Sequence, residues 1–241
     1  MTLDSWKDPF KAAWPIMAGY VVLGLPCGIL GVAAGMDGWM VAAMSILFYS
    51  GAGQYMIPNM WLAGNPIGAI VLSVSLVNSR QTLYGASLSQ FCDAASKRLA
   101  CLFGATVTDE SFGVNLARFM NGGWSVSDAL RVNVLSQSSW ILSNVAGAVV
   151  GAAISVPTAL ASFAMTSLFI CLLSMQKASP ENFVAIGGAV AGVVLCKSVG
   201  LAGPAILVGA LIGVAAAVVF SRRTMRGPSG ASGATDIRMG G

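Results

Sequence analysis

The stretch PIGAIVLSVSLVNSRQTLYGASLSQF, residues 66–91, sets the fold class of the chain, and its only charged residue is Arg80. It is long enough to cross a membrane, which takes about 20 apolar residues. A cation at the centre of a membrane helix costs roughly 3 kcal/mol, so such a residue usually faces a partner, a cavity or a solute. We therefore expect a membrane segment with a paired or functional charge inside it.

The composition of the whole chain also indicates a membrane protein. Only 9% of the residues are charged and 56% are hydrophobic, whereas soluble domains carry about 25% charged residues. We expect an all-α integral membrane protein, a bundle of about six to seven transmembrane helices with segments broken by glycine and proline. The stretch Leu99–Met120 carries three charges and is interpreted as amphipathic or partly re-entrant. The strong apolar segments are Ala12–Gly35, Trp39–Ala63, Pro66–Phe91, Val132–Ile154, Thr158–Met175, Phe183–Leu195 and Leu201–Phe220.

The domain organisation follows from the same composition. Residues 1–221 are expected to form a single membrane domain, and the small, polar and basic residues 222–241 a disordered tail. The first apolar run is longer than the 7 to 15 residues of a signal-peptide core, so we expect it to be retained. The cysteines at positions 27, 92, 101, 171 and 196 form no C-x-x-C pair. They indicate neither a disulfide framework nor a metal site.

The basic residues predict an orientation. Placed on the cytoplasmic side, most of them satisfy the positive-inside rule and put the C-terminus inside, with Lys197 as the exception. The side of the membrane on which the N-terminus lies stays open. A full crossing by the first segment would put Lys7 and Lys11 outside, whereas a hairpin broken at Gly24–Gly28 would keep them inside. Length favours the crossing. The residues assigned to the inside are Lys97, Arg98, Arg118, Arg131, Lys177, Arg222, Arg223 and Arg226.

Glycines predict both close helix packing and helix breaks. G-x-x-x-G spacing allows helix backbones to approach closely in a membrane, and it occurs at Gly31/Gly35, Gly147/Gly151, Gly188/Gly192 and Gly209/Gly213. Glycine beside proline, in Gly24–Gly28 and Gly200–Pro204, is expected to interrupt helices and free backbone groups to line a central site. The weak likeness of these two stretches leaves an inverted repeat open.

A polar stripe runs along the segment Val132–Ile154. Its residues recur every three or four positions, so one helix face carries them. They serve either interhelical hydrogen bonds or the lining of a site. The stripe consists of Asn133, Ser136, Gln137, Trp140, Asn144 and Gly147.

Four motifs follow one another along the chain: FYSGAGQY at 48–55, VNSRQTLYGASL at 77–88, TDESF at 108–112 and SQSSW at 136–140. In this order they resemble the AzlC family, the large subunit of bacterial branched-chain amino acid exporters, YgaZ-like proteins included. The resemblance covers about residues 18–220. It implies a multi-pass protein of the bacterial inner membrane that exports apolar amino acids together with a small AzlD-like membrane subunit, without a cofactor.

The resemblance assigns roles to polar residues of the motifs. A bound apolar amino acid needs a cation or helix N-terminus for its carboxylate, acceptors for its ammonium group, and an apolar pocket. In this interpretation Arg80 binds the carboxylate through its planar guanidinium. Asn78, Gln54 and Ser50 offer polar contacts, while Tyr84 and Trp140, together with Tyr49 and Tyr55, shape the wall or a gate.

Arg80 has two competing interpretations. It pairs with Asp109 or Glu110 and joins two segments, or its head reaches water at the membrane interface. Family members often carry an Arg-His pair where this chain has Arg80-Gln81, and the chain contains no histidine. Coupling to protons through a histidine is therefore excluded, and Asp109 and Glu110 are the titratable groups left near the motifs.

The same residues also bear on other function classes. A chain without histidine has few ways to build a catalytic set, so no enzyme is expected. The basic residues are explained by orientation, so neither is nucleic-acid binding. A channel or a structural membrane subunit for another small solute remains the alternative to an exporter, because pore-lining and packing residues look alike in sequence. Assembly as a homo-oligomer is also left open.

Overall fold

The structure is a computed structural model that describes residues 6–154, 157–174, 178–198 and 205–225. Helices are the only regular secondary structure in these ranges, which confirms the all-α class for the described part of the chain. The helices are α1 (Lys7–Ala33), α2 (Gly38–Leu47), α3 (Gly51–Leu62), α4 (Ile67–Leu88), the 3-10 turn η2 (Ser89–Phe91), α5 (Lys97–Ala105), α6 (Asp109–Met120), α7 (Val126–Ala153), α8 (Thr158–Ser174), α9 (Pro180–Ser198) and α10 (Ala205–Met225).

The chain divides into two compact units, Met1–Cys171 and Leu172–Gly241, which are described separately. The single membrane domain expected for residues 1–221 stays a prediction. Among the described residues, α1 and α9 are the helices that are both long and apolar enough to cross a membrane. The expected count of six to seven transmembrane helices therefore also stays a prediction.

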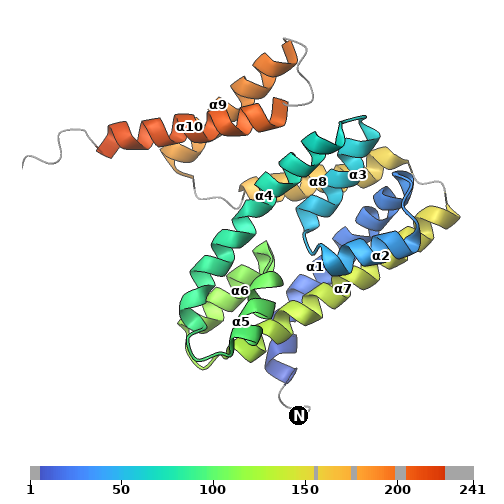
Figure 1. Ribbon diagram of the computed structural model, residues 1–241, viewed down its shortest axis with the longest axis vertical. Coiled ribbons are helices and arrows are strands. Elements are labelled where there is room, and N and C mark those ends of the chain that lie inside the picture. Colours follow the sequence, from blue (N-terminus) through green and yellow to red (C-terminus); the bar gives the residue numbers. More distant parts are fainter. Residues whose placement is uncertain (1–5, 155–156, 175–177, 199–204, 226–241) are drawn as a thin grey trace, which may run out of the picture. The chain divides into compact units, whose positions relative to one another are not determined.

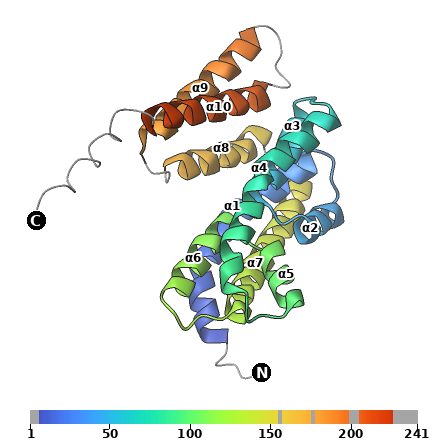
Figure 2. The ribbon, with the colours of Figure 1, turned by 60° about the vertical axis from the view of Figure 1, so that its left-hand side comes forward.

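The helices α1 and α7 form the centre of the first unit and lie side by side along most of their length (Figures 1 and 2). Small residues allow this approach: a Cβ on Gly28 would collide with the backbone of Asn144, and one on Gly147 with the backbone of Leu25. The packing role predicted for Gly147 and Gly151 is confirmed. The hydroxyls of Ser139 and Ser143 on α7 donate to α1 carbonyls, which ties the two backbones together.

The break expected at Gly24–Gly28 is absent, because α1 runs without interruption through Pro15 and Pro26. The prediction was wrong for a physical reason. In this chain Gly24 and Gly28 bring α1 against α7, and neighbouring helices donate hydrogen bonds to carbonyls around the proline, as from the Tyr55 hydroxyl to Leu23. Proline is tolerated in a membrane helix when neighbours satisfy the backbone in this way. The second predicted break, Gly200–Pro204, lies outside the described residues.

The segment Trp39–Ala63, expected as one transmembrane helix, is instead a hairpin of two half-length helices, α2 and α3. The chain turns back at Phe48–Ser50, where Ser50 caps α3 by accepting a hydrogen bond from the Gly53 amide at 3.1 Å. The turn lies halfway along α7: Gln137 donates to the Ile46 carbonyl at 3.2 Å, and Gly51 lies beside the Trp140 ring. This hairpin enters the unit from one end and leaves at the same end (Figure 1).

A second hairpin, α5 and α6, enters from the opposite end (Figures 1 and 2). Its turn reaches inward as well, since Asn133 of α7 donates to Thr106 at 3.1 Å and Thr108 lies against Tyr20 of α1. Thr108 begins α6 with a capping box that it forms with Ser111. The expectation that Leu99–Met120 is not one ordinary span is thus met by two short helices.

These hairpins bear on the position of the N-terminus, which the sequence left open. Lys11 of α1 and Arg118 of α6 line the same cavity, and the guanidinium of Arg131 lies 5.4 Å from the ring centre of Trp6. The N-terminal lysines therefore share one end of the unit with the basic residues between α4 and α7, although α1 is unbroken. The unbroken α1 agrees with the first sequence-based alternative, and the shared end of the basic residues agrees with the second. Both alternatives counted Trp39–Ala63 as a crossing, and the membrane side of the N-terminus stays a prediction.

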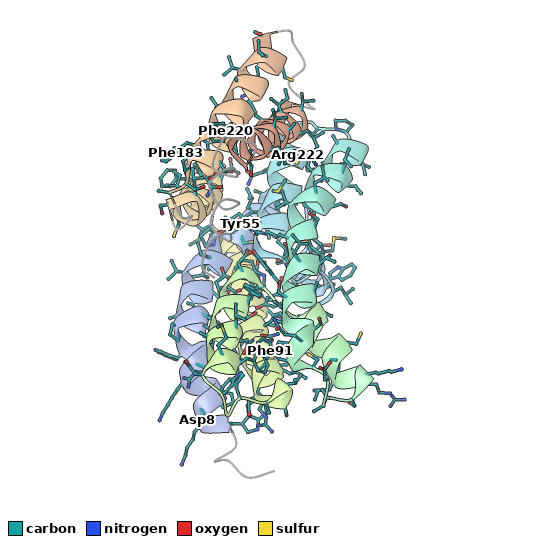
Figure 3. All side chains as sticks on the ribbon, turned by 90° about the vertical axis from the view of Figure 1, so that its left-hand side faces the viewer. Asp8, Tyr55, Phe91, Phe183, Phe220 and Arg222 are labelled. Carbon is teal, nitrogen blue, oxygen red and sulfur yellow. The ribbon has the colours of Figure 1, made fainter. Side chains whose placement is uncertain are left out.

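The second unit is built on α9 and α10, which pack through glycines. A Cβ on Gly192 would lie 2.8 Å from the Cα of Gly209, and one on Gly188 would lie 3.2 Å from the Cα of Gly213. Two predicted G-x-x-x-G contacts are thereby confirmed, whereas Gly35 lies in a turn with φ of 90° beyond the end of α1. Figure 3 shows Phe183 on α9 and Phe220 and Arg222 on α10. Of the expected tail, 222–225 belong to α10 and 226–241 lie outside the described residues.

Candidate functional site

The charge in the middle of α4 is paired. Arg80 Nη2 lies 2.7 Å from Asp109 Oδ2, and the Tyr84 hydroxyl donates to the other oxygen of Asp109 at 2.6 Å. The two charged side chains remain 28% and 23% exposed, so the described residues cover the pair only in part. The structure thus forms the ion pair that competed with substrate binding as the interpretation of Arg80.

Glu110, the other acid of the same helix turn, has a different neighbourhood. Its Oε2 accepts a hydrogen bond from the Tyr20 hydroxyl at 2.7 Å, and the same hydroxyl lies 2.8 Å from Thr108 Oγ1. Within the described ranges Glu110 forms no ion pair. Both acids occupy the first turn of α6, where the helix dipole favours negative charge.

The remaining predicted site residues meet in two pairs. Ser50 donates to Asn78 Oδ1 at 2.7 Å, which connects the turn of the first hairpin to the middle of α4. Trp140 Nε1 donates to Gln54 Oε1 at 3.0 Å, and Ser45 donates to the same oxygen at 3.2 Å. The Gln54 amide also donates to the Phe48 carbonyl, so it holds the turn between α2 and α3.

Aromatic rings connect these pairs into one group of side chains, called the group below. It consists of Tyr20, Ser45, Tyr49, Ser50, Gln54, Asn78, Arg80, Tyr84, Thr108, Asp109, Glu110 and Trp140. The Tyr20 ring meets the Trp140 ring edge-on with centroids 5.2 Å apart, and meets the Tyr49 ring edge-on at 6.3 Å. Gln81 donates to the Tyr49 carbonyl at 3.4 Å, which brings α4 to the same place. The N-termini of α3 and α6 therefore both reach the Tyr20–Trp140 contact, one through Gly51 and one through Thr108.

Arg80 Nε is buried and makes no hydrogen bond in the described parts of the chain. The Tyr49 hydroxyl is also buried without a well-aligned hydrogen bond, although the Tyr20 and Thr108 side chains lie near it. Buried polar groups are nearly always paired, so each such donor calls for an explanation. A ligand with acceptor oxygens would supply the missing partners.

Tyr55 and Asn133, both candidates for lining the site, instead hold helices together. Tyr55, offered as a wall residue, is fully buried and donates to the α1 backbone. Asn133 at the start of the polar stripe donates to Thr106 and accepts from Asn115, so it fastens the second hairpin. Most of the stripe is buried against other helices, as expected for residues that cannot face lipid. Tyr55 in Figure 3 lies well away from Asp8, at the N-terminal end of α1.

Sequence analysis missed Tyr20, Thr108 and Ser45 as members of the group. Tyr20 is the central one, because it contacts Glu110, Thr108, Tyr49 and Trp140. The available signal was a tyrosine in the middle of the apolar run Ala12–Gly35, far from the segment ends where interfacial tyrosines gather. Among the described residues no cluster of three or more histidine, cysteine, aspartate or glutamate side chains could hold a metal ion.

Helices of this length and composition, broken hairpins and a charged group between them define a helical membrane protein. The AzlC protein family model matches residues 15–154. The chain belongs to the AzlC family. The match contains every residue of the group described above.

Curated relatives agree with the family model. An uncharacterized membrane protein of Helicobacter pylori is 32% identical over 75% of this chain and 79% of its own length. The inner membrane protein YgaZ of Escherichia coli is 30% identical over 79% of this chain and 82% of its own length. The branched-chain amino acid transport protein AzlC of Bacillus subtilis is 29% identical over 71% of this chain and 68% of its own length. No solved structure matches the chain.

Proposed function

We propose that the protein exports apolar amino acids, branched-chain ones foremost, across the bacterial inner membrane. The observation that carries the proposal is the meeting of two half-length hairpins, from opposite ends of the unit, at the Tyr20–Trp140 contact, with the Arg80–Asp109 pair at the N-terminus of α6. Transporters commonly place their substrate sites at the inner ends of broken helices near the middle of the membrane, within inverted repeats. In this chain a long helix followed by a hairpin occurs twice: first α1 with α2–α3, then α4 with α5–α6. The two sets of helices run in opposite directions, as the halves of an inverted repeat do (Figure 1).

The chemistry of the group suits an amino acid. The α3 N-terminus and Arg80 attract a carboxylate, the acids of α6 attract an ammonium group, and the Tyr20, Tyr49 and Trp140 rings offer apolar contact. A relative named for branched-chain amino acid transport supports the same substrate class. Asp109 and Glu110 are the groups through which coupling to protons would act, since the chain has no histidine.

The proposed complex includes a small AzlD-like membrane subunit beside this chain. The experiment compares cells that make this chain alone, the small subunit alone, both together, or neither. Each strain is loaded with radiolabelled leucine or valine, and the initial rate of efflux is measured. Saturable efflux that needs this chain is the expected result.

Three outcomes would contradict the proposal. Unchanged efflux for every apolar amino acid tried would remove the substrate class. Efflux that rises linearly with internal concentration and does not distinguish between solutes would instead favour a channel, which was the alternative that the sequence left open. Efflux that needs only the small subunit would make this chain a structural subunit.

A further inference from the structure

We infer that Glu110 is the acceptor of the substrate's α-ammonium group and thereby makes the site selective for amino acids over simple carboxylates. The inference rests on the proposed function and assigns the specificity of the same site. It starts from the different situations of the two acids in the first turn of α6. Asp109 is neutralised by Arg80, whereas Glu110 holds only hydrogen-bond donors.

The charges of the group do not balance within the described chain. Arg80 and Asp109 cancel, and Glu110 is left as a carboxylate that is partly buried and forms no ion pair there. The Tyr20 hydroxyl contacts Glu110, and the rings of Tyr49 and Trp140 pack against the Tyr20 ring. A carboxylate without a cationic partner, next to an aromatic side chain, is a favourable place for a cation, and an ammonium group is the cation that an amino acid brings.

The unsatisfied donor of Arg80 completes the complementarity. Arg80 Nε lacks an acceptor, and a substrate carboxylate would provide one. Arg80 binds one carboxylate oxygen of Asp109, and the Tyr84 hydroxyl donates to the other. Within the described residues Arg80 thus has a buried donor without an acceptor and Glu110 has no cation beside it, and a zwitterion supplies both partners.

Tyr20 is the positioning residue for Glu110. Its hydroxyl bridges Glu110 and Thr108 and fixes the carboxylate at the N-terminus of α6. Tyr20 is itself only 5% exposed and is held by α7, since Ser143 donates to its backbone carbonyl. The ammonium acceptor is therefore supported from three helices and cannot easily follow a ligand that lacks the amino group.

The test uses leucine and its amine-free analogue 4-methylpentanoate. Proteoliposomes with the full chain and the small subunit are loaded with radiolabelled leucine and increasing unlabelled competitor, and efflux is followed. For the wild type we expect 4-methylpentanoate to compete at least about tenfold more weakly than leucine, because a charged hydrogen bond is missing. Equal competition by the amine-free analogue would overturn the inference without any variant.

The variant Glu110→Gln keeps the shape and removes the charge. We expect the half-saturating leucine concentration to rise about 10- to 100-fold, with 4-methylpentanoate then competing about as well as leucine. Glu181→Gln, which changes an acid in the first turn of α9, is the control and should leave both values unchanged. An unaltered preference in Glu110→Gln would overturn the inference. If wild-type vesicles show no saturable leucine efflux, the proposed function fails instead, which is a separate result.

Discussion

Arg80 on α4 and Asp109 on α6 form an ion pair of 2.7 Å between Nη2 and Oδ2. The pair joins the middle of a long helix to the inner end of a half-length one, and its second nitrogen, Nε, is buried without an acceptor. This geometry is a structural link, and in the proposed function it is also part of the substrate site. The two roles differ in what they require of the side chain.

The first prediction separates these roles with Arg80→Lys. A lysine keeps the positive charge beside Asp109 but has neither the planar fork nor the Nε donor. We expect the variant to reach the membrane at normal levels and to export leucine at least about tenfold more slowly. Membrane abundance and initial efflux rate are the two measurements. Arg118→Gln, at the opposite end of α6 and outside the group, is the control. A normal rate in Arg80→Lys would leave the ion pair as purely structural.

The second prediction concerns the contact between α1 and α7. In Gly28→Ala the new methyl group would meet the backbone of Asn144 and Ala148, and overpacking of this kind costs about 1 to 3 kcal/mol. We expect a lower unfolding temperature in detergent and less protein in the membrane. Gly19→Ala is the matched control because the same helix has open space there, and it should be neutral or slightly stabilising. Equal stability of the two variants would contradict the packing.

The third prediction tests the turn between α2 and α3. Trp140→Phe removes the 3.0 Å hydrogen bond to Gln54 and leaves its Oε1 with Ser45 alone. Loss of a buried hydrogen bond costs about 1 to 3 kcal/mol, and the turn held by Gln54 should loosen. We expect a lower unfolding temperature in detergent for the variant. Trp39→Phe, a change at an exposed tryptophan of the same hairpin, should unfold at the wild-type temperature.

The fourth prediction follows from the hairpin topology. Cys101 is exposed on α5, whereas Cys27 is buried in α1. In variants with one cysteine each, a membrane-impermeant maleimide should label Cys101 from the cytoplasmic side and leave Cys27 unlabelled. A cysteine placed by Lys7→Cys should react from the same side as Cys101. Reaction from opposite sides would restore Trp39–Ala63 as a crossing.

Much of the fold was predictable from local patterns. The unbroken helices α4, α7, α8 and α9 cover the predicted apolar segments, because apolar length and helical periodicity are local properties of the chain. The glycines at 147, 151, 188 and 192 were recognisable as packing positions from their spacing. The motifs around Arg80 and Asp109 placed the candidate site residues in the right part of the molecule, although their roles stay predictions.

The sequence by itself determined the helical membrane class, the packing glycines and the energetic cost of placing a charge at Arg80 within an apolar segment. Only the tertiary structure decided that Trp39–Ala63 folds back on itself, because the turn carbonyls of Ile46 and Phe48 are satisfied by the side chains of Gln137 and Gln54. Hydropathy records how apolar a segment is and does not record which distant side chain will satisfy a backbone group at a break. For the same reason, only the fold showed that Arg80 is neutralised by Asp109, while Glu110 is left to Tyr20.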